Sequence, residues 1–173
     1  MPSVGDMLIG RSPLPPADYI AETRRLYSSL GYEPYRWAER PDPPPWAPID
    51  RPLADCRVAV IASGGIYRAG QIAFHHRDDT SIRIIGRATP TEELRATHFA
   101  YDLTDARADP NCVFPIDTLR DLAADGLIGG LAEELYTFMG GIYSTRKVEE
   151  IVAPQLVELV GGQAPDVVLL VPV

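Results

Sequence analysis

The stretch Arg57-Val58-Ala59-Val60-Ile61-Ala62-Ser63-Gly64-Gly65 decides how the rest of the chain is interpreted. It is a short apolar run with β-branched residues, closed by a serine and two glycines, and such runs between turn signals are typical of fully buried strands. Because both faces are apolar, a parallel sheet covered on each side is favoured over an antiparallel one. Ligand crevices in open α/β sheets lie beyond the carboxyl ends of the strands. We therefore expect the functional edge of the fold at Ser63, Gly64 and Gly65.

Length and charge limit the classes of protein to which the chain can belong. Its 173 residues suit one domain. The formal net charge of −8 argues against binding to nucleic acid and against docking on an anionic membrane. The N-terminal residues lack the features of a secretory signal, and no apolar run approaches the ~20 residues of a membrane helix. We therefore expect a cytoplasmic protein with Cys56 and Cys112 as buried, reduced thiols.

Composition divides the chain into three segments. Residues 1–31 hold an N-terminal helix, and residues 32–56 are rich in proline, which excludes a helix interior or central strand and favours an extended arm. Trp37 and Trp46 lie in this arm. An exposed tryptophan leaves a large apolar area in water, so we expect the arm to pack on the domain or on a second subunit, such as a second copy of the chain. Residues 57–173 are expected to form one α/β domain.

The predicted fold class is α/β, with a small, mostly parallel sheet flanked by helices in three layers. Strands are predicted at Arg57–Ser63, Ser81–Ile85 and Val167–Pro172. Residues 97–115 are interpreted as a long ordered loop. Helices are predicted at residues 19–30 with a stop at Gly31, within 89–96, at 118–124 with Asp117 as cap, at 131–138, and from Ser144 or Thr145 through a kink at Pro154 to Gly161 and Gly162.

The final strand makes the C-terminal end of the chain important. Its five large apolar side chains would forfeit on the order of 10 kcal/mol if left in water, at ~1.5–3 kcal/mol for each. That sum is comparable to the stability of a whole domain. We therefore expect residues 166–173 to form a central or well-covered strand, and Val173 to lie at the edge where α/β proteins place their chemistry.

A second group of polar residues lies in the 97–115 segment. We predict that His98, Tyr101 and Asp102 join Ser63-Gly64-Gly65 in a pocket that orients a small substrate, with His98 able to transfer protons near neutral pH. The alternative for the same loop is a network that caps its own backbone, as Asp commonly does. The Ser63-Gly64-Gly65 stretch fits either a plain tight turn or a backbone nest for an anion.

The histidine pair, the second pair of glycines and the two cysteines are weaker candidates for a functional site. No metal site is predicted, because the adjacent His75 and His76 lack a favoured chelating spacing. Gly140-Gly141 leads into a helix N-terminus, where an anion is favourable, but loop geometry is the preferred explanation. Cys112 has no basic neighbour that would lower its pKa, and Cys56 starts a strand at the opposite edge. We therefore identify no catalytic nucleophile in the chain.

Several segments match a known family in the same order along the chain. They are Pro-Pro-Pro-Trp-Ala-Pro at 43–48, residues 57–67, Asp-Asp-Thr-Ser-Ile-Arg at 78–83, Thr-His-Phe-Ala-Tyr-Asp at 97–102, residues 105–115 and Thr-Phe-Met-Gly-Gly at 137–141. They resemble the glycine/sarcosine/betaine reductase selenoprotein B family, with its D-proline reductase relatives. The resemblance covers nearly everything from Tyr32 to Val173.

The resemblance implies reductive cleavage of a C–N or related bond by a selenolate or thiolate. It implies a small amino-acid-like substrate, other reductase subunits as partners, and a pyruvoyl group on one of those partners, with no cofactor in this chain. It places the selenocysteine or cysteine directly after the segment equivalent to Leu170–Val173, so we expect a UGA codon for selenocysteine after Val173. Two other classes stay open: a non-catalytic ligand-binding or subunit-interaction module, and a hydrolase or lyase with His98 as base.

Overall fold

The computed structural model describes residues 18–33 and 38–173. The chain divides into two compact units, Met1–Pro43 and Pro44–Val173. The division into three segments, made on composition, stays a prediction. The sheet, the glycine-rich turns and the polar loop on which the functional hypothesis rests all belong to the second unit.

The first unit contains α1 (Tyr19–Ser29), which confirms the predicted N-terminal helix. Asp18 caps its amino end by accepting a hydrogen bond from the backbone N–H of Ala21 at 3.0 Å. Gly31 follows with a φ of +80°, the left-handed conformation in which glycine commonly ends a helix. No residue of α1 is buried.

The proline-rich segment forms neither helix nor strand in its described part, residues 38–52. Its side chains are exposed, and Trp46 has 83% of its surface accessible. Packing of Trp46 on its own domain, one of the two predicted arrangements, is therefore wrong. Contact of the arm with a second subunit stays a prediction, and Trp37 lies outside the described residues.

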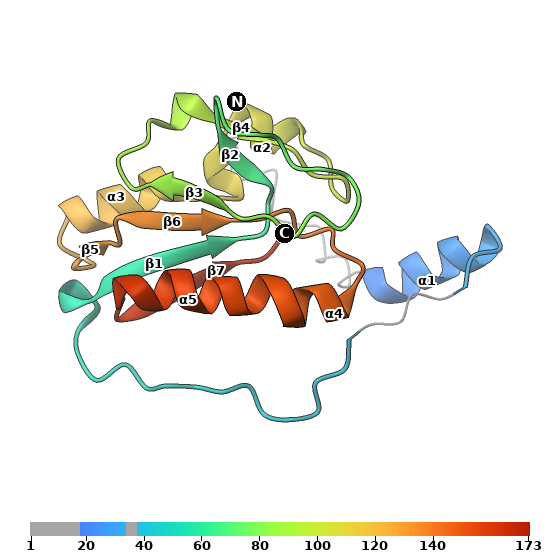
Figure 1. Ribbon diagram of the computed structural model, residues 1–173, viewed down its shortest axis with the longest axis horizontal. Helices are drawn as coiled ribbons and strands as arrows, with labels where there is room; N and C mark the ends of the chain where they lie inside the picture. Colours follow the sequence, from blue (N-terminus) through green and yellow to red (C-terminus); the bar gives the residue numbers. More distant parts are fainter. Residues whose placement is uncertain (1–17, 34–37) are drawn as a thin grey trace, which may run out of the picture. The chain divides into compact units, whose positions relative to one another are not determined.

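The second unit is built on one mostly parallel sheet, which confirms the predicted fold class (Figure 1). The central strand is β1 (Arg57–Ala62), which is parallel to all three strands with which it pairs. On one side it pairs with β5 (Gly130–Leu131) and then β6 (Glu134–Thr137), and on the other with β7 (Val167–Val171). The outer strand next to β6 is β3 (Arg83–Gly86), which runs antiparallel to it.

Two sequence predictions about this sheet are wrong in part. The predicted strand Ser81–Ile85 begins two residues later, at Arg83, and is the antiparallel one. The predicted helix at 131–138 is instead β5 and β6. Leu135 and Tyr136 are fully buried there. A short apolar run that is buried on both faces of a sheet has no periodicity that separates strand from helix.

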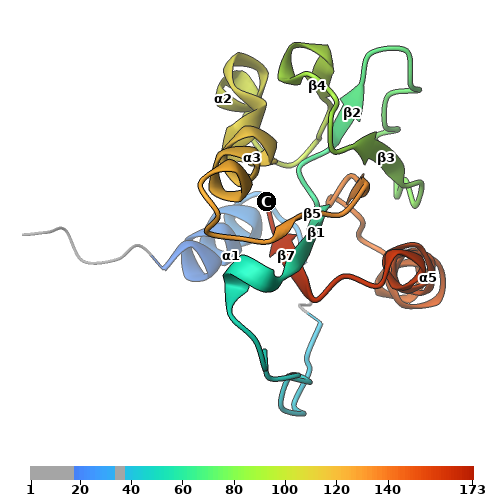
Figure 2. The same ribbon diagram turned by 90° about the vertical axis from the view of Figure 1, so that its left-hand side faces the viewer.

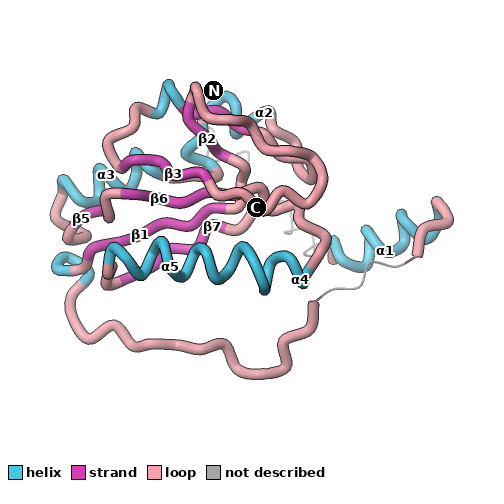
Figure 3. The backbone as a smooth tube through the Cα atoms, in the orientation of Figure 1, coloured by secondary structure: helices cyan, strands magenta, loops and turns pink. Residues whose placement is uncertain are grey.

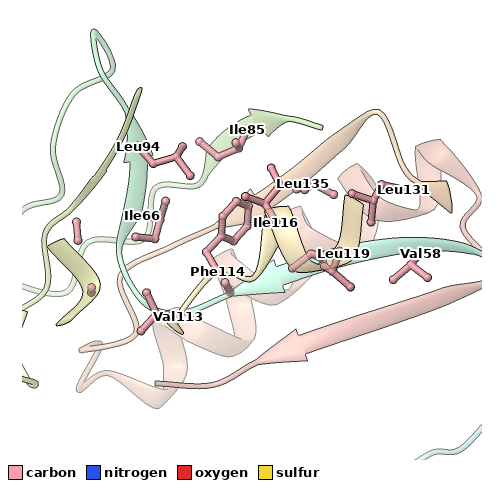
Figure 4. Close-up of a cluster of buried hydrophobic side chains, with 14 of the residues drawn as sticks. Val58, Ile66, Ile85, Leu94, Val113, Phe114, Ile116, Leu119, Leu131 and Leu135 are labelled. Carbon is pink, nitrogen blue, oxygen red and sulfur yellow. The ribbon is translucent and has the colours of Figure 1, made fainter. Parts of the chain in front are cut away.

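Helices cover both faces of the sheet, as the three-layer prediction requires (Figure 2). On one face, α3 (Ile116–Ala124) contributes Ile116 and Leu119 to a core that includes Val58 of β1 (Figure 4). On the other face, α5 (Ala153–Gln163) packs Leu156 against Ala59 and the strand β6. The alternating side chains of β1 therefore enter two separate cores.

The long helical segment before β7 follows most of its prediction. Ser144 caps α4 (Thr145–Lys147), and a π-helical turn (Val148–Val152) joins α4 to α5. The wide turn lies directly before Pro154, where the missing backbone N–H was predicted to disturb the helix. The helix passes through Gly161 and Gly162 and ends at Gln163, because the left-handed position is taken by Ala164 instead.

The predicted role of Asp117 as a helix cap is wrong. The helix α3 begins one residue earlier, with Pro115 at the N-cap position. The Asp117 carboxylate instead accepts hydrogen bonds from the Thr91 hydroxyl at 2.5 Å, the Asn111 amide at 3.0 Å and the Arg120 guanidinium at 2.7 Å. These bonds, with that from Thr91 the strongest influence, lower the pKa of Asp117.

Two strands of the segment between β1 and α3 form a small sheet of their own (Figure 3). The strands β2 (Ile66–Arg68) and β4 (Leu94–Ala96) pair antiparallel. The short helix predicted within 89–96 is a single 3₁₀ turn, Thr91–Glu93, that leads into β4. The predicted long loop at 97–115 is ordered, but it contains the helix α2 (Thr104–Ala108) and a 3₁₀ turn at Pro110–Cys112.

The last strand is less covered than the sequence predicts. Among the described strands, β7 pairs with β1 alone, so it lies at an edge of the sheet. Its Val168 and Leu170 are 40% and 66% exposed, while the alternate side chains pack partly against the core beside α3. The prediction of a central or well-covered strand is therefore wrong, because α5 covers β1 and β6 rather than β7.

Candidate functional site

The connections of the sheet create a switch point at its carboxyl edge. From β1 the chain reaches β6 by way of α3 on one face, and from β6 it returns to β7 by way of α5 on the other face (Figure 2). The chain therefore leaves the carboxyl ends of β1 and β6 toward opposite faces. Ligand crevices in open α/β sheets lie at such points. We therefore identify the two loops that follow β1 and β6 as the candidate site.

Each of these loops contains two adjacent glycines. We call Ser63–Gly65, after β1, the first glycine turn, and Met139–Gly141, after β6, the second glycine turn. The two turns are joined by backbone hydrogen bonds, since the Gly65 N–H donates to Phe138 at 3.1 Å and the Gly140 N–H donates to Ser63 at 2.9 Å. The pair of loops is thus one connected unit.

Close packing explains why glycine stands in both turns. Gly65 has a φ of +71°, and a Cβ there would overlap the carbonyl oxygen of Thr97. A Cβ at Gly140 would lie 2.9 Å from the Cβ of Ser63. Glycine avoids both the backbone strain and the overlap. The first glycine turn is therefore a tight turn, which is the simpler of the two interpretations offered by its sequence.

The described C-terminal end lies against the first glycine turn. The backbone N–H of Val173 donates to the Ser63 hydroxyl at 3.0 Å, and the Ser63 N–H donates to the carbonyl of Val171 at 3.1 Å. A Cβ at Gly64 would lie 3.3 Å from Val173 and 2.9 Å from Val113. Figure 3 shows the C-terminus at the same end of the sheet as the carboxyl ends of β1 and β6.

His98 and Tyr101 lie beside the same turn. The Tyr101 hydroxyl donates to the carbonyl of Gly64 at 2.8 Å, and its ring lies 4.6 Å from that of His98. The residue His98 is 5% exposed, and its Nδ1 accepts the backbone N–H of Ala100 at 3.1 Å. Burial lowers the pKa of His98 and raises the pKa of Tyr101, so both side chains are neutral near pH 7.

Asp102 does not reach the glycine turns by any hydrogen bond of its own. Its carboxylate accepts from the backbone N–H of Thr104 at 2.9 Å and from the hydroxyl of the same residue at 2.7 Å. The two bonds, that from the hydroxyl first, lower the pKa of Asp102. The structure therefore brings five predicted residues together, and Asp102 serves the start of α2. The capping interpretation therefore holds for Asp102, and the substrate pocket at the other residues stays a prediction.

The second glycine turn lies beside the first at the carboxyl edge of the sheet, although it was not among the site residues predicted from the sequence. Met139 is fully buried, and its Sδ accepts the backbone N–H of Gly141 at 3.1 Å. The signal was present, because a second pair of glycines directly follows an apolar run. It was missed because residues 131–138 were interpreted as a helix, whose end would not lie at the carboxyl edge of a sheet.

The described residues offer no metal centre and no activated thiol. Residues 18–33 and 38–173 contain no group of three metal-ligating side chains. Cys56 is buried and donates to the carbonyl of Pro52, beyond the amino end of β1. Cys112 is exposed, which corrects the prediction of two buried thiols. Its pKa is raised by partial burial and by the nearby Asp109 and Asp105, which disfavours a thiolate.

Comparison with known proteins identifies the family. The model of the glycine/sarcosine/betaine reductase selenoprotein B family matches residues 35–171, which include both glycine turns and His98. The chain belongs to this family. The selenoprotein B family was also the one indicated by the sequence motifs, so that interpretation is confirmed.

Two curated relatives agree with the family assignment. The chain is 34% identical over 128 residues to D-proline reductase subunit gamma of Acetoanaerobium sticklandii, and the match covers 74% of this chain and 53% of that protein. It is 32% identical to the gamma subunit of glycine reductase complex component B of Symbiobacterium thermophilum, over 66% of this chain and 29% of that protein. The chain thus spans about half or less of these relatives.

No solved structure matches the chain significantly. Within the part that the structure describes, every helix is too short or too polar to cross a membrane.

Proposed function

We propose that this chain is part of a reductase subunit of the glycine, sarcosine, betaine or D-proline type, and that the two glycine turns hold its small amino-acid-like substrate. Ser63, Gly64, Gly65, His98 and Tyr101 would contribute to the binding edge, together with the second glycine turn. The observation that carries the proposal is the position of Val173, hydrogen-bonded to Ser63 at the switch point of the sheet.

The nucleophile of the proposed reaction is a selenol or thiol held next to Val173. A selenol is ionised at neutral pH, and a thiol is ionised there only where its surroundings lower its pKa. Overall, the C–N bond breaks with its electron pair leaving on the amine, a C–H bond forms, and two thiols supply two electrons as they become a disulfide. This division of labour fits the described residues, whose own cysteines lack the features of an activated thiol.

The chain's own residues would position the substrate. The glycines allow the two loops to pack closely against each other and against Val113 and Thr97, because no Cβ stands in the way. The hydrogen bond from Tyr101 to Gly64 holds the first glycine turn in place, and the two bonds between the turns keep them in register. His98 stands beside them as a buried side chain whose Nδ1 lone pair already accepts the backbone N–H of Ala100, which argues against the alternative of a hydrolase or lyase with His98 as base.

Two observations favour the second candidate function, a ligand-binding or subunit-interaction module. The described residues hold no activated nucleophile, and Trp46 is 83% exposed in the proline-rich arm. We propose that the arm contacts another reductase subunit, including the one with the pyruvoyl group, or a second copy of the chain. A native mass that depends on concentration and falls in Trp46→Ala supports this contact, and a mass unchanged by the substitution contradicts it.

The deciding experiment for the reductase is to read the gene beyond codon 173. The proposal expects an in-frame selenocysteine or cysteine codon directly after it, and a run of unrelated stop codons contradicts it. The complex is then isolated through a tag on this subunit and tested for dithiol-dependent amine release from glycine, sarcosine, betaine and D-proline. A matched complex with serine at that codon should be inactive. Because the reaction needs reduced thiols, we propose a cytoplasmic location.

A further inference from the structure

One buried side-chain atom of the described residues has no hydrogen-bond partner, and it is Nε2 of His98. The residue as a whole is 5% exposed, so bulk solvent does not reach this atom. Buried polar atoms almost always have a partner, because an unpaired one costs free energy. An exception beside the switch point of a sheet indicates an atom that becomes paired when a ligand binds.

The hydrogen bonds of His98 decide which ring nitrogen carries the proton. Nδ1 accepts the backbone N–H of Ala100 at 3.1 Å, so Nδ1 must offer its lone pair and bear no hydrogen. In a neutral imidazole the proton then lies on Nε2, which makes Nε2 a donor. Burial keeps the ring neutral. His98 is therefore an uncharged side chain with one unused N–H.

The His98 ring lies between the two glycine turns. A Cβ at Gly65 would lie 3.4 Å from the Cβ of His98, and a Cβ at Gly141 would lie 3.8 Å from its Cε1. Because Nε2 is bonded to Cε1, the unused N–H lies close to the second glycine turn. Tyr101, 4.6 Å away between ring centres, packs against the imidazole and limits its movement.

We propose that the N–H at Nε2 of His98 donates to a carboxylate oxygen of a small amino acid that binds beside the second glycine turn. This inference rests on the proposed function, since it assigns one atom of that substrate. A neutral donor needs an acceptor, and a protonated or fully methylated amine has no free lone pair to offer. The carboxylate is the one group of such a substrate that only accepts hydrogen bonds. His98 is thus a substrate-binding donor that recognises the carboxyl end.

The first test is a titration of the full-length protein, labelled with ¹⁵N in its histidine rings. The chain has three histidines, and the His98 signals are assigned by their loss in His98→Gln. Free protein should have neutral His98 with the proton on Nε2. Glycine betaine and acetate should shift that proton downfield. Choline, which shares the trimethylammonium group of betaine and lacks the carboxylate, should leave it unchanged.

Two substitutions separate the two ring nitrogens. His98→Gln keeps an amide donor near the position of Nε2, and His98→Asn keeps a polar atom only near the position of Nδ1. We expect Asn to weaken betaine binding by about tenfold to a hundredfold, the effect of one hydrogen bond to a charged group, and Gln to weaken it less. His75→Asn is the matched control, because His75 Nδ1 also accepts a backbone N–H two residues on, but the side chain is exposed.

Several outcomes overturn the inference. In the NMR titration, these are a His98 proton on Nδ1, a charged His98 imidazolium at pH 7, or equal proton shifts with betaine and choline. In the binding measurements, it is an equal loss of betaine affinity in His98→Gln and His98→Asn, with thermal unfolding unchanged in both. A shift that appears only when the selenol or thiol beyond Val173 is ionised assigns the donor to the nucleophile instead and also overturns it. Reductase activity without a carboxylate shift rejects this inference alone. Carboxylate binding through His98 in a complex that reduces none of the four substrates rejects the proposed function alone.

Discussion

The strands β1 and β7 have similar sequences and very different surroundings. Both are short apolar runs with β-branched residues, and the two pair with each other along five positions. Val60 in β1 is 1% exposed, whereas Leu170 in β7 is 66% exposed. A central strand has a neighbour on each side and helices on both faces, while β7 has one described neighbour and one covered face. The apolar side chains of a strand therefore set how much surface it could bury, and the position of the strand in the sheet decides how much it does bury.

The largest effect is expected at the turn after β1. In Gly65→Ala the new Cβ overlaps the Thr97 carbonyl, at a φ of +71° that L residues rarely adopt. We expect a loss of more than about 4 kcal/mol in the free energy of unfolding, measured by urea denaturation. Gly162→Ala, in the helix before β7, is the matched control. It has open space around the new Cβ and should stabilise the protein by ~0.5–1 kcal/mol. Equal stability in the two variants contradicts the close packing of the glycine turns.

The next largest loss of stability is expected when one apolar side chain of β1 is shortened, and the same change in β7 is the comparison. Val60→Ala removes two buried methyl groups from the core and should cost about 2 kcal/mol. Leu170→Ala removes a larger side chain, but from the exposed face, and should change stability by less than about 0.5 kcal/mol. Urea denaturation of the two variants gives both values. A larger loss in Leu170→Ala means that β7 is covered in solution.

A third prediction concerns Tyr136, which attaches the helix α5 to β6 beside the central strand and has no counterpart on β7. Its hydroxyl donates to the carbonyl of Leu159 at 3.0 Å and accepts from the Gln163 amide at 2.7 Å. Tyr136→Phe should cost about 1 kcal/mol at pH 8, since two hydrogen bonds of a buried hydroxyl are lost.

The same tyrosine gives a pH dependence. Burial, with the neighbouring Glu134 carboxylate, raises the pKa of Tyr136 to about 12. The neutral phenol is therefore favoured in the folded state. Its contribution should be complete below pH ~10, the value for an unfolded tyrosine, and should be lost as the pH rises toward 12. The stability difference between the wild type and Tyr136→Phe should thus stay constant up to pH 10 and shrink above it. An absorbance titration in which every tyrosine ionises near pH 10 contradicts this.

The smallest effect is expected from a polar exchange on the open face. Val168→Thr replaces a methyl group by a hydroxyl on a residue that is 40% exposed, and should change stability by less than about 0.5 kcal/mol. Val58→Thr makes the same exchange in β1, where the residue is 5% exposed, and should cost at least about 1 kcal/mol. Thermal unfolding of the pair measures both. If both substitutions lower the melting temperature equally, β1 and β7 do not differ in burial as described.

Local sequence was enough to predict one of the two turns that form the candidate site. Ser63-Gly64-Gly65 follows an apolar run closed by glycines, and both features act within nine residues. The pairing of this turn with Met139–Gly141 depends on the topology, because residues 131–138 join the sheet only when β1 is already beside them. Asp102 was assigned to the pocket because the sequence does not show which hydrogen bonds its carboxylate makes. Its neighbours in sequence lie beside the first glycine turn, but its own carboxylate is used by Thr104.

The sequence by itself determined the family, the α/β class, the central strand and the first glycine turn, because these depend on residue types and spacings that act over short distances. Tertiary structure alone decided that β7 is an edge strand, that two glycine turns meet at one switch point, and that His98 keeps an unpaired N–H between them. Burial and hydrogen-bond pairing are properties of neighbours in space. Those neighbours come from segments up to 110 residues apart, as in the bond between Ser63 and Val173, so no local pattern contains them.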